Sequence, residues 1–142
     1  MMHEKELIIL IVEDDDGHAE LIQTGLRESG MCNTMLRFAD GEKVWQFLTG
    51  TGTPVRDKRK TYLLLLDINI SKIDGLKVLK RIKDSEELKV IPVIILTTTD
   101  DPQEVEECYQ LGCSAYITKP VDFEKFAEIL YRLGLFVQIM TI

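Results

Sequence analysis

The feature that most constrains this chain is a short apolar run that ends in a single acid. Residues 62–66 are Tyr followed by four Leu, and Asp67 comes directly after them. A run this short, without polar alternation, is typical of a strand that is buried on both faces of a parallel sheet. In open α/β sheets, ligands bind beyond the carboxyl ends of such strands. Asp67 is therefore predicted to lie at the edge of the sheet where ligands bind.

Three further apolar runs also end in polar residues. They are residues 7–12, followed by Glu13, Asp14, Asp15 and Asp16; residues 91–96, followed by Thr97, Thr98 and Thr99; and residues 115–117, which lead to Lys119 and Pro120. A single Asp or Thr after a strand is commonly a helix cap or a turn residue. Four strand ends of this kind in one short chain do not fit that explanation as a set, and they predict one polar site.

Length and composition limit what the chain can be. Its 142 residues are enough for one domain with a sizeable core. A net charge of −7 argues against nonspecific attraction to DNA or to an anionic membrane surface. Three cysteines without metal-type spacing indicate a reducing compartment, and the apolar run of 7–12 is too short for a signal peptide or a membrane span. We therefore expect a cytoplasmic protein that binds neither DNA nor membrane.

The order of the elements indicates the fold class. Apolar runs alternate with amphipathic helical stretches five times, which predicts an α/β fold with a doubly wound parallel sheet. The expected helices lie at 17–30, at 42–49, after Gly75, between Pro102 and Gly112, and from Phe123 to Gly134. The first two strands are expected at 7–12 and 33–38.

The predicted cluster of acids favours metal-assisted phosphoryl chemistry. Glu13, Asp14 and Asp67 would repel one another if brought together, so a site built from them requires a cation. Oxygen ligands in a site of this kind suit Mg²⁺, which is typically shared with a phosphoryl group. A carboxylate is ionised at neutral pH and can itself attack phosphorus to form an aspartyl phosphate. The Lys119 ammonium and the Thr97 hydroxyl would then position and neutralise the phosphoryl group; the alternative for Lys119 is a surface lysine in a turn.

Four motifs of this chain match those of a known family. They are VEDD at 12–15, LLLLDINISKIDG at 63–75, IILTT at 94–98 and AYITKP at 115–120. Through them the chain resembles the receiver domain of bacterial two-component response regulators, up to about Gly134. It looks most like the stand-alone, chemotaxis-regulator-like members that partner phytochrome-type histidine kinases. The resemblance implies a flavodoxin-like fold with five parallel strands in the order 2-1-3-4-5 and five helices.

The resemblance also implies a role for each candidate residue. Asp67 would be the phosphoacceptor, and Lys119 would pair with the phosphoryl group. Mg²⁺, or Mn²⁺ in its place, would be bound by Glu13, Asp14, Asp67 and the backbone carbonyl of Asn69. Thr97 and Tyr116 would be the switch residues. A cis peptide bond is implied before Pro120. The implied partner is a sensor histidine kinase, and the chain would be a signalling phosphoacceptor that catalyses only its own phosphorylation and dephosphorylation. Ser71 departs from the family, which usually has proline there.

Two other functions use a similar arrangement of elements. A phosphohydrolase of the haloacid-dehalogenase type also has an Asp after an apolar strand, but it needs a second Asp two residues later, where this chain has Asn69. A flavodoxin-like flavin or nucleotide binder needs a phosphate-cradling loop after the first strand, where this chain has four acids. We rank both alternatives below the phosphoacceptor.

The last eight residues are predicted to form an apolar tail. Gly134 suits the left-handed position that follows a helix, so we expect the fifth helix to end there. The receiver domain would then span 1–134, the tail would span 135–142, and there would be no output domain. Extended, the tail would reach about 26 Å. One alternative is that the tail folds back on its own fifth helix or first strand. We expect instead that it joins two copies in a homodimer, because related receivers pair through the adjoining fifth helix.

Overall fold

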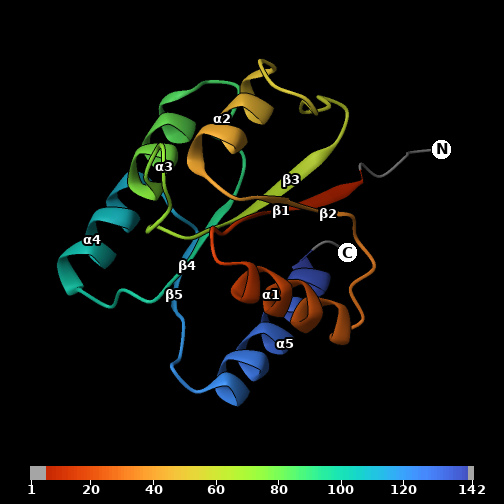
Figure 1. Ribbon diagram of the computed structural model, residues 1–142. Helices are drawn as coiled ribbons and strands as arrows, with labels where there is room; N and C mark the ends of the chain where they lie inside the picture. The colour runs from red at the N-terminus through yellow and green to blue at the C-terminus, as the bar shows by residue number, and fades with distance from the viewer. Residues whose placement is uncertain (1–5, 141–142) are drawn as a thin grey trace.

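The structure, a computed structural model, describes residues 6–140 and contains one five-stranded parallel sheet with five helices (Figure 1). Along the chain the elements are β1 (Leu7–Val12), α1 (Asp16–Glu28), β2 (Met35–Phe38), α2 (Gly41–Thr49), β3 (Thr61–Leu66), α3 (Gly75–Asp84), β4 (Val93–Thr97), α4 (Pro102–Leu111), β5 (Ala115–Thr118) and α5 (Phe123–Met140). The strand order is β2-β1-β3-β4-β5. The predicted fold class and strand order are therefore confirmed.

Helices cover both faces of the sheet. Helices α1 and α5 lie on one side, and α2, α3 and α4 lie on the other (Figure 1). Successive strand residues point to opposite faces. Ile9 and Ile11 of β1 accordingly belong to the core beneath α1 and α5, and Leu10 and Val12 belong to the core beneath α2, α3 and α4. Burial on both faces explains why the strand sequences show no polar alternation.

The strand register brings the candidate residues to one edge of the sheet. Strand β1 pairs with β3 so that Val12 lies beside Leu66, and the next residues are Glu13 and Asp67. Strand β4 pairs with β5 so that Thr97 lies beside Thr118, and Lys119 follows. Because all the strands are parallel, these residues leave the sheet at the same end.

Acidic side chains at this edge also cap the helices. Asp15, Asp40, Asp74 and Asp101 each accept a backbone N–H in the first turn of the helix that follows. Such a cap stabilises a helix by about 1 kcal/mol. The capping residue of α1 is Asp15, and Asp16 is the first residue of the helix itself. Capping therefore accounts for Asp15 but leaves Glu13, Asp14 and Asp67 for another purpose.

The prediction that the fifth helix ends at Gly134 is wrong, because α5 continues to Met140. Gly134 is buried inside the helix, where a Cβ atom would collide with the side chain of Ser29 in α1's C-terminal cap. The amide of Gln138 donates to both the carbonyl and the hydroxyl oxygen of Ser29, at 3.1 Å each. Glycine is needed here for a close helix contact rather than for a left-handed turn. The expected boundary between domain and tail falls within α5, and residues 141–142 lie outside the described residues.

Two smaller differences from the prediction concern prolines. The cis peptide bond that the structure shows between residues 6 and 140 is Thr53–Pro54, so the expectation of a cis bond before Pro120 is wrong. Proline permits the cis form at modest cost but does not require it. Pro92 precedes β4 rather than lying within it.

Among residues 6–140, none of the helices combines the length and apolar character that a membrane crossing needs.

We predict that Gly134→Ala lowers the free energy of unfolding, although alanine favours a helix by about 1 kcal/mol over glycine. The added methyl group must displace Ser29, and overpacking of this kind typically costs about 1–3 kcal/mol. Urea denaturation measures the change. A second substitution, Ser29→Gly, should recover part of the loss when it is compared with Ser29→Gly alone. A neutral or stabilising Gly134→Ala would contradict the close contact between α1 and α5.

Candidate functional site

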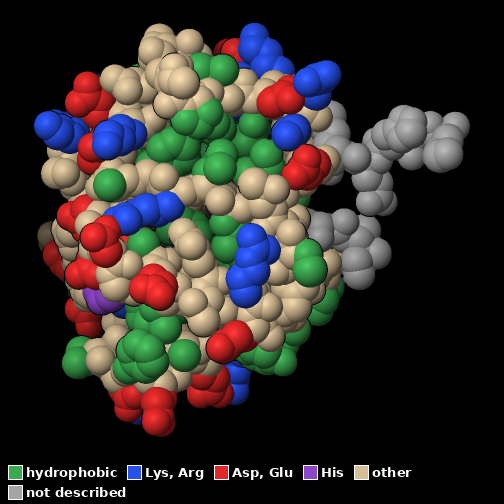
Figure 2. Space-filling model, turned by 45° about the vertical axis from the view of Figure 1, so that its right-hand side comes forward, with side chains coloured by type: hydrophobic (Ala, Val, Ile, Leu, Met, Phe, Trp, Pro, Cys, Tyr) green, Lys and Arg blue, Asp and Glu red, His purple; other side chains and the backbone are tan. Residues whose placement is uncertain are grey.

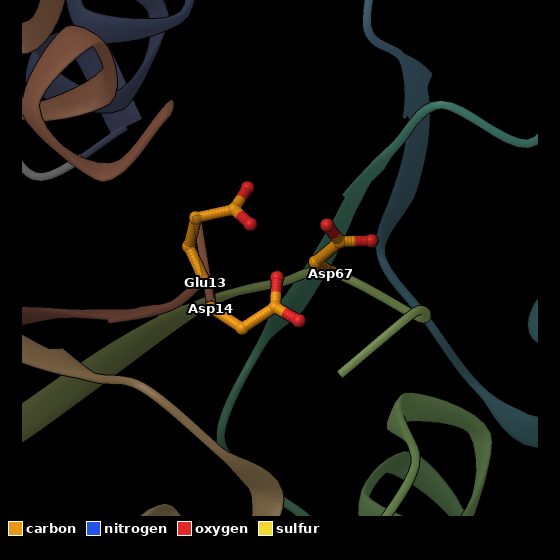
Figure 3. A group of neighbouring side chains, drawn as sticks. All are labelled: Glu13, Asp14 and Asp67. Carbon is orange, nitrogen blue, oxygen red and sulfur yellow. The ribbon is translucent and has the colours of Figure 1, made fainter. Parts of the chain in front are cut away.

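Three carboxylates meet where β1 and β3 end. Glu13 and Asp14 follow β1, Asp67 follows β3, and one oxygen from each lies within 4.8 Å of the others. Figure 3 shows the three side chains around a shared space between the two strand ends. Glu13 and Asp67 are buried, whereas Asp14 is exposed. The structure therefore brings together the three acidic side chains that the sequence predicted as metal ligands.

The ammonium of Lys119 lies between two of these carboxylates. Its Nζ donates to Oδ2 of Asp67 at 3.0 Å and forms an ion pair with Oε1 of Glu13. The Lys119 side chain is only 2% exposed, so it is not a surface lysine. Buried carboxylates need such a partner, because an unpaired buried charge costs several kcal/mol, on the order of 3–5. Lys119 thus supplies the cation that lets Glu13 and Asp67 lie side by side.

Burial also changes the protonation of the site. Burial raises the pKa of Glu13 to about 7; the hydrogen bond and the charge of Lys119 oppose the rise, and the nearby Asp67 charge adds to it. One ammonium does not neutralise three carboxylates. Carboxylate oxygens are the ligands that Mg²⁺ and Mn²⁺ prefer, and Asp14 remains open to solvent. The donor set therefore fits a hard divalent cation.

Thr97 carries a buried hydroxyl that has no partner. It is the last residue of β4 and is fully buried, and its Oγ1 makes no hydrogen bond. Within residues 6–140 it is the one buried side-chain oxygen or nitrogen in this condition. The backbone places it beside the site, because the Lys119 N–H donates to the Thr97 carbonyl at 2.6 Å. An unpaired buried hydroxyl costs about 1–3 kcal/mol and needs an explanation.

Tyr116 and Asn69 both contact Thr99, in the loop after β4. The Tyr116 hydroxyl donates to the Thr99 carbonyl at 2.6 Å, and the Asn69 amide donates to the Thr99 hydroxyl at 3.1 Å. The Asn69 backbone N–H donates to Oδ1 of Asp67, also at 3.1 Å. Burial, with smaller contributions from Glu104 and other nearby acidic groups, raises the pKa of Tyr116 to about 12, so its hydroxyl stays protonated as a donor. Thr99 therefore connects the loop that follows Asp67 to β5.

Sequence reasoning missed one residue of this site and one contact within it. The side chains of Thr99 and Asn69 were expected only to help place the water that removes the phosphoryl group, and the hydrogen bond that joins them across thirty positions was not foreseen. His18 was not considered, although its Nδ1 lies 3.2 Å from Nζ of Lys119. The available signal was a histidine in the first turn of a helix that directly follows an acidic cluster.

The comparison with known families identifies the family of the chain. Residues 9–131 match the response regulator receiver domain. The chain belongs to this family. Its relatives are signalling response regulators, so the chain is a receiver rather than a typical enzyme, and neither the phosphohydrolase nor the flavin-binder alternative is favoured.

Several response regulators are similar to this receiver over most of its length. Rcp1 of Synechocystis sp. is 37% identical over 112 residues, which cover 79% of this chain and 76% of Rcp1. The solved Mn²⁺-bound form of Rcp1 has a TM-score of 0.83 at 32% identity, covering 92% of this chain and 93% of that one. A receiver domain from Rhodospirillum rubrum has a TM-score of 0.87 at 39% identity, with 95% and 96% covered. The phosphorylated cyanobacterial phytochrome response regulator RcpA has a TM-score of 0.82 at 31% identity, with 94% of each chain covered.

We predict that Thr97→Val stabilises the unphosphorylated receiver by about 1 kcal/mol or more, because a methyl group replaces an unpaired buried hydroxyl of similar shape. Thr99→Val is the matched control, since the Thr99 hydroxyl accepts a hydrogen bond from Asn69 and its loss should not stabilise. Urea denaturation of both variants measures the difference. If Thr97→Val were the less stable of the two, the hydroxyl of Thr97 would have a partner in the resting protein.

Proposed function

We propose that this receiver is a phosphorylation-dependent switch in which Asp67 accepts a phosphoryl group from a sensor histidine kinase in a Mg²⁺-dependent reaction. The observation that carries the proposal is the contact between the buried Lys119 ammonium and Asp67, beside two further carboxylates. A structural ion pair of Lys119 with Glu13 and Asp67 would not need a third carboxylate, yet the exposed Asp14 lies beside them. The whole group suits a reaction that brings in additional charge.

In the proposed reaction Asp67 is the nucleophile. A bond forms between a carboxylate oxygen of Asp67 and phosphorus, while the bond from phosphorus to the donor breaks and the donor keeps the electron pair. Hydrogen bonds from the Asn69 N–H and from Lys119 fix the two oxygens of Asp67 before the reaction. Glu13, Asp14, Asp67 and the backbone carbonyl of Asn69 would hold the divalent cation, and Lys119 would move its hydrogen bond onto a phosphoryl oxygen. A bound cation supplies positive charge that neutralises the transferring group.

The proposed switch begins at Thr97. A phosphoryl oxygen on Asp67 would give the unpaired Thr97 hydroxyl the acceptor that it lacks in the resting protein. Such a contact differs between the two states, and only differences of this kind can shift an equilibrium. Movement of Thr97 would leave space for Tyr116, whose ring is half-buried and whose hydroxyl now donates to Thr99. Tyr116 would then turn inward and change the surface formed by α4 and β5.

We infer that the kinase partner is of the phytochrome type and that the downstream partner is a protein. The similarity to RcpA, whose structure is described as that of a phytochrome response regulator, supports this choice of kinase. The net charge of −7 argues against binding to DNA or to an anionic membrane surface. The three cysteines without metal-type spacing support a reducing compartment, the cytoplasm. The chain would catalyse only its own phosphorylation and dephosphorylation.

We also propose a homodimer that forms through the C-terminal end of α5. Phe136, Ile139 and Met140 are 57%, 66% and 67% exposed, and Phe136 and Met140 border an apolar groove of about 280 Å³ that also includes Leu7 and Ile94. A second copy of this end could cover these side chains. On the face in Figure 2, hydrophobic side chains also reach the surface in several patches between charged ones.

Treatment with acetyl phosphate and Mg²⁺ should label wild-type protein once, and Asp67→Asn should abolish the label because an amide is not a nucleophile. Intact-mass spectrometry measures the label. Asp84→Asn, a change of an exposed carboxylate on α3, is the matched control and should be labelled like wild type. Removal of Mg²⁺ with a chelator should prevent labelling. Undiminished labelling of Asp67→Asn would rule out the assigned phosphoacceptor.

For the homodimer, the double substitution Phe136→Ser and Ile139→Ser should convert dimer to monomer in sedimentation velocity experiments, with and without phosphorylation. Val121→Ser is the control, because Val121 is fully exposed in the loop before α5 and away from the helix end. Substitution is preferable to truncation at Gly134, which would remove the buried Val137. A wild-type chain that remains monomeric at high micromolar concentration in both states would exclude the proposed dimer.

A further inference from the structure

His18 contacts Lys119 but has no role in the proposed reaction as described above. Its Nδ1 lies 3.2 Å from Nζ of Lys119, and its side chain is 41% exposed, while Lys119 is 2% exposed. An ammonium has three hydrogen-bond donors and no acceptor. A hydrogen bond between the two groups therefore requires Nδ1 to be the acceptor and the ring proton to lie on Nε2.

The ammonium of Lys119 has as many acceptors as it has protons. They are Oε1 of Glu13, Oδ2 of Asp67 and Nδ1 of His18. These acceptors come from three elements, since Glu13 follows β1, Asp67 follows β3 and His18 lies in α1. Two of them are buried carboxylates, and His18 is the third. The position of the ammonium is therefore fixed from three sides rather than by the two carboxylates alone.

The His18 ring is itself held in place. It packs against the ring of Phe126 of α5 in a T-shaped pair, with ring centroids 6.0 Å apart and planes at 87°. Phe126 is 3% exposed and belongs to the core beneath α1 and α5. The His18 backbone N–H donates to the capping oxygen of Asp15 at 2.9 Å. A ring that is fixed by its neighbours can fix Lys119 in turn, because little further ordering is needed when the two meet.

We propose that His18 is a positioning residue for phosphoryl transfer, whose Nδ1 holds the Lys119 ammonium in place beside Asp67. The proposal rests on the proposed function. When Asp67 gains a phosphoryl group, Lys119 exchanges its bond to Oδ2 for one to a phosphoryl oxygen. The bond to His18 need not change in that exchange, so it keeps the ammonium from swinging away. Loss of the acceptor should therefore slow the reaction with phosphoryl donors.

Three substitutions separate the acceptor from the ring. His18→Asn places an amide oxygen at the position of Nδ1, without a ring. His18→Leu has the same branching as asparagine but no acceptor, and His18→Phe keeps a ring against Phe126 but has no acceptor. Labelling of Asp67 by acetyl phosphate with Mg²⁺, followed by intact mass, gives the rate. We expect His18→Asn to react within about twofold of wild type, and the Leu and Phe variants to react about three- to tenfold more slowly, as the loss of one hydrogen bond predicts.

The pattern among the variants decides the matter. If His18→Phe reacted like wild type and His18→Asn did not, the ring would serve only for packing and the proposal would be wrong. Equal rates in all four proteins would also overturn it. Urea denaturation of each variant confirms that it is folded, so that a slow rate is not a consequence of unfolding.

A second measurement does not depend on phosphorylation. A ¹H–¹⁵N NMR correlation of the Lys119 ammonium reports how fast its protons exchange with water, and buried, hydrogen-bonded protons exchange slowly. We expect slow exchange in wild type and His18→Asn and faster exchange in His18→Leu and His18→Phe. If the wild-type protein could not be labelled at Asp67, the proposed function would fail, while this measurement would still test the contact. Identical exchange in all four proteins would rule out His18 as an acceptor.

Discussion

The ion pair of Lys119 with Glu13 and Asp67 is the interaction on which the site depends. Two carboxylates can be buried side by side only if a cation accompanies them, and that cation comes from the far end of the chain. The sheet provides the geometry, because the parallel pairing of β1 with β3, and of β4 with β5, ends all of these strands at one edge. A slip of one residue in either pairing would move Glu13 or Lys119 to the opposite face. The register of the hydrophobic core therefore sets the distances within the site.

The resting site carries unsatisfied groups that a reaction could satisfy. Three carboxylates are accompanied by one ammonium, and burial raises the pKa of Glu13 to about 7. The buried hydroxyl of Thr97 has no partner. A divalent cation would neutralise the excess negative charge of the carboxylates, and a phosphoryl oxygen would accept a hydrogen bond from Thr97. Natural proteins often give up stability at functional sites in this way, and the two deficits indicate the charge and the chemistry that the site is suited to receive.

The sequence predicted the elements that follow from a local pattern. It did not predict features that depend on contacts between distant residues. Short apolar runs identified the strands, and the polar residues at their ends identified Asp67, Glu13 and Asp14, because a parallel sheet aligns strand ends whatever the loops do. Gly134 was misjudged because its local preference for ending a helix gave way to a contact with Ser29, more than a hundred residues earlier. His18 was missed for the same reason, since Lys119 lies 101 positions away. Neither contact leaves a periodic signal in its own segment.

The pair formed by α1 and α5 joins two regions that the proposed function treats separately. At one end, the ring of His18 packs on Phe126 beside Lys119. At the other end, Gln138 donates to Ser29, and exposed apolar side chains follow. Helix α5 has 18 residues and is therefore about 27 Å long. A dimer contact at the C-terminal end of α5 could influence the site only if α1 and α5 can pack in two arrangements. The dimer contact and the phosphorylated site would each have to favour one of them. Gly25 and Gly134 make that packing close, since a Cβ atom at either position would collide with the other helix or its cap, so a second arrangement would have to rebuild these two contacts.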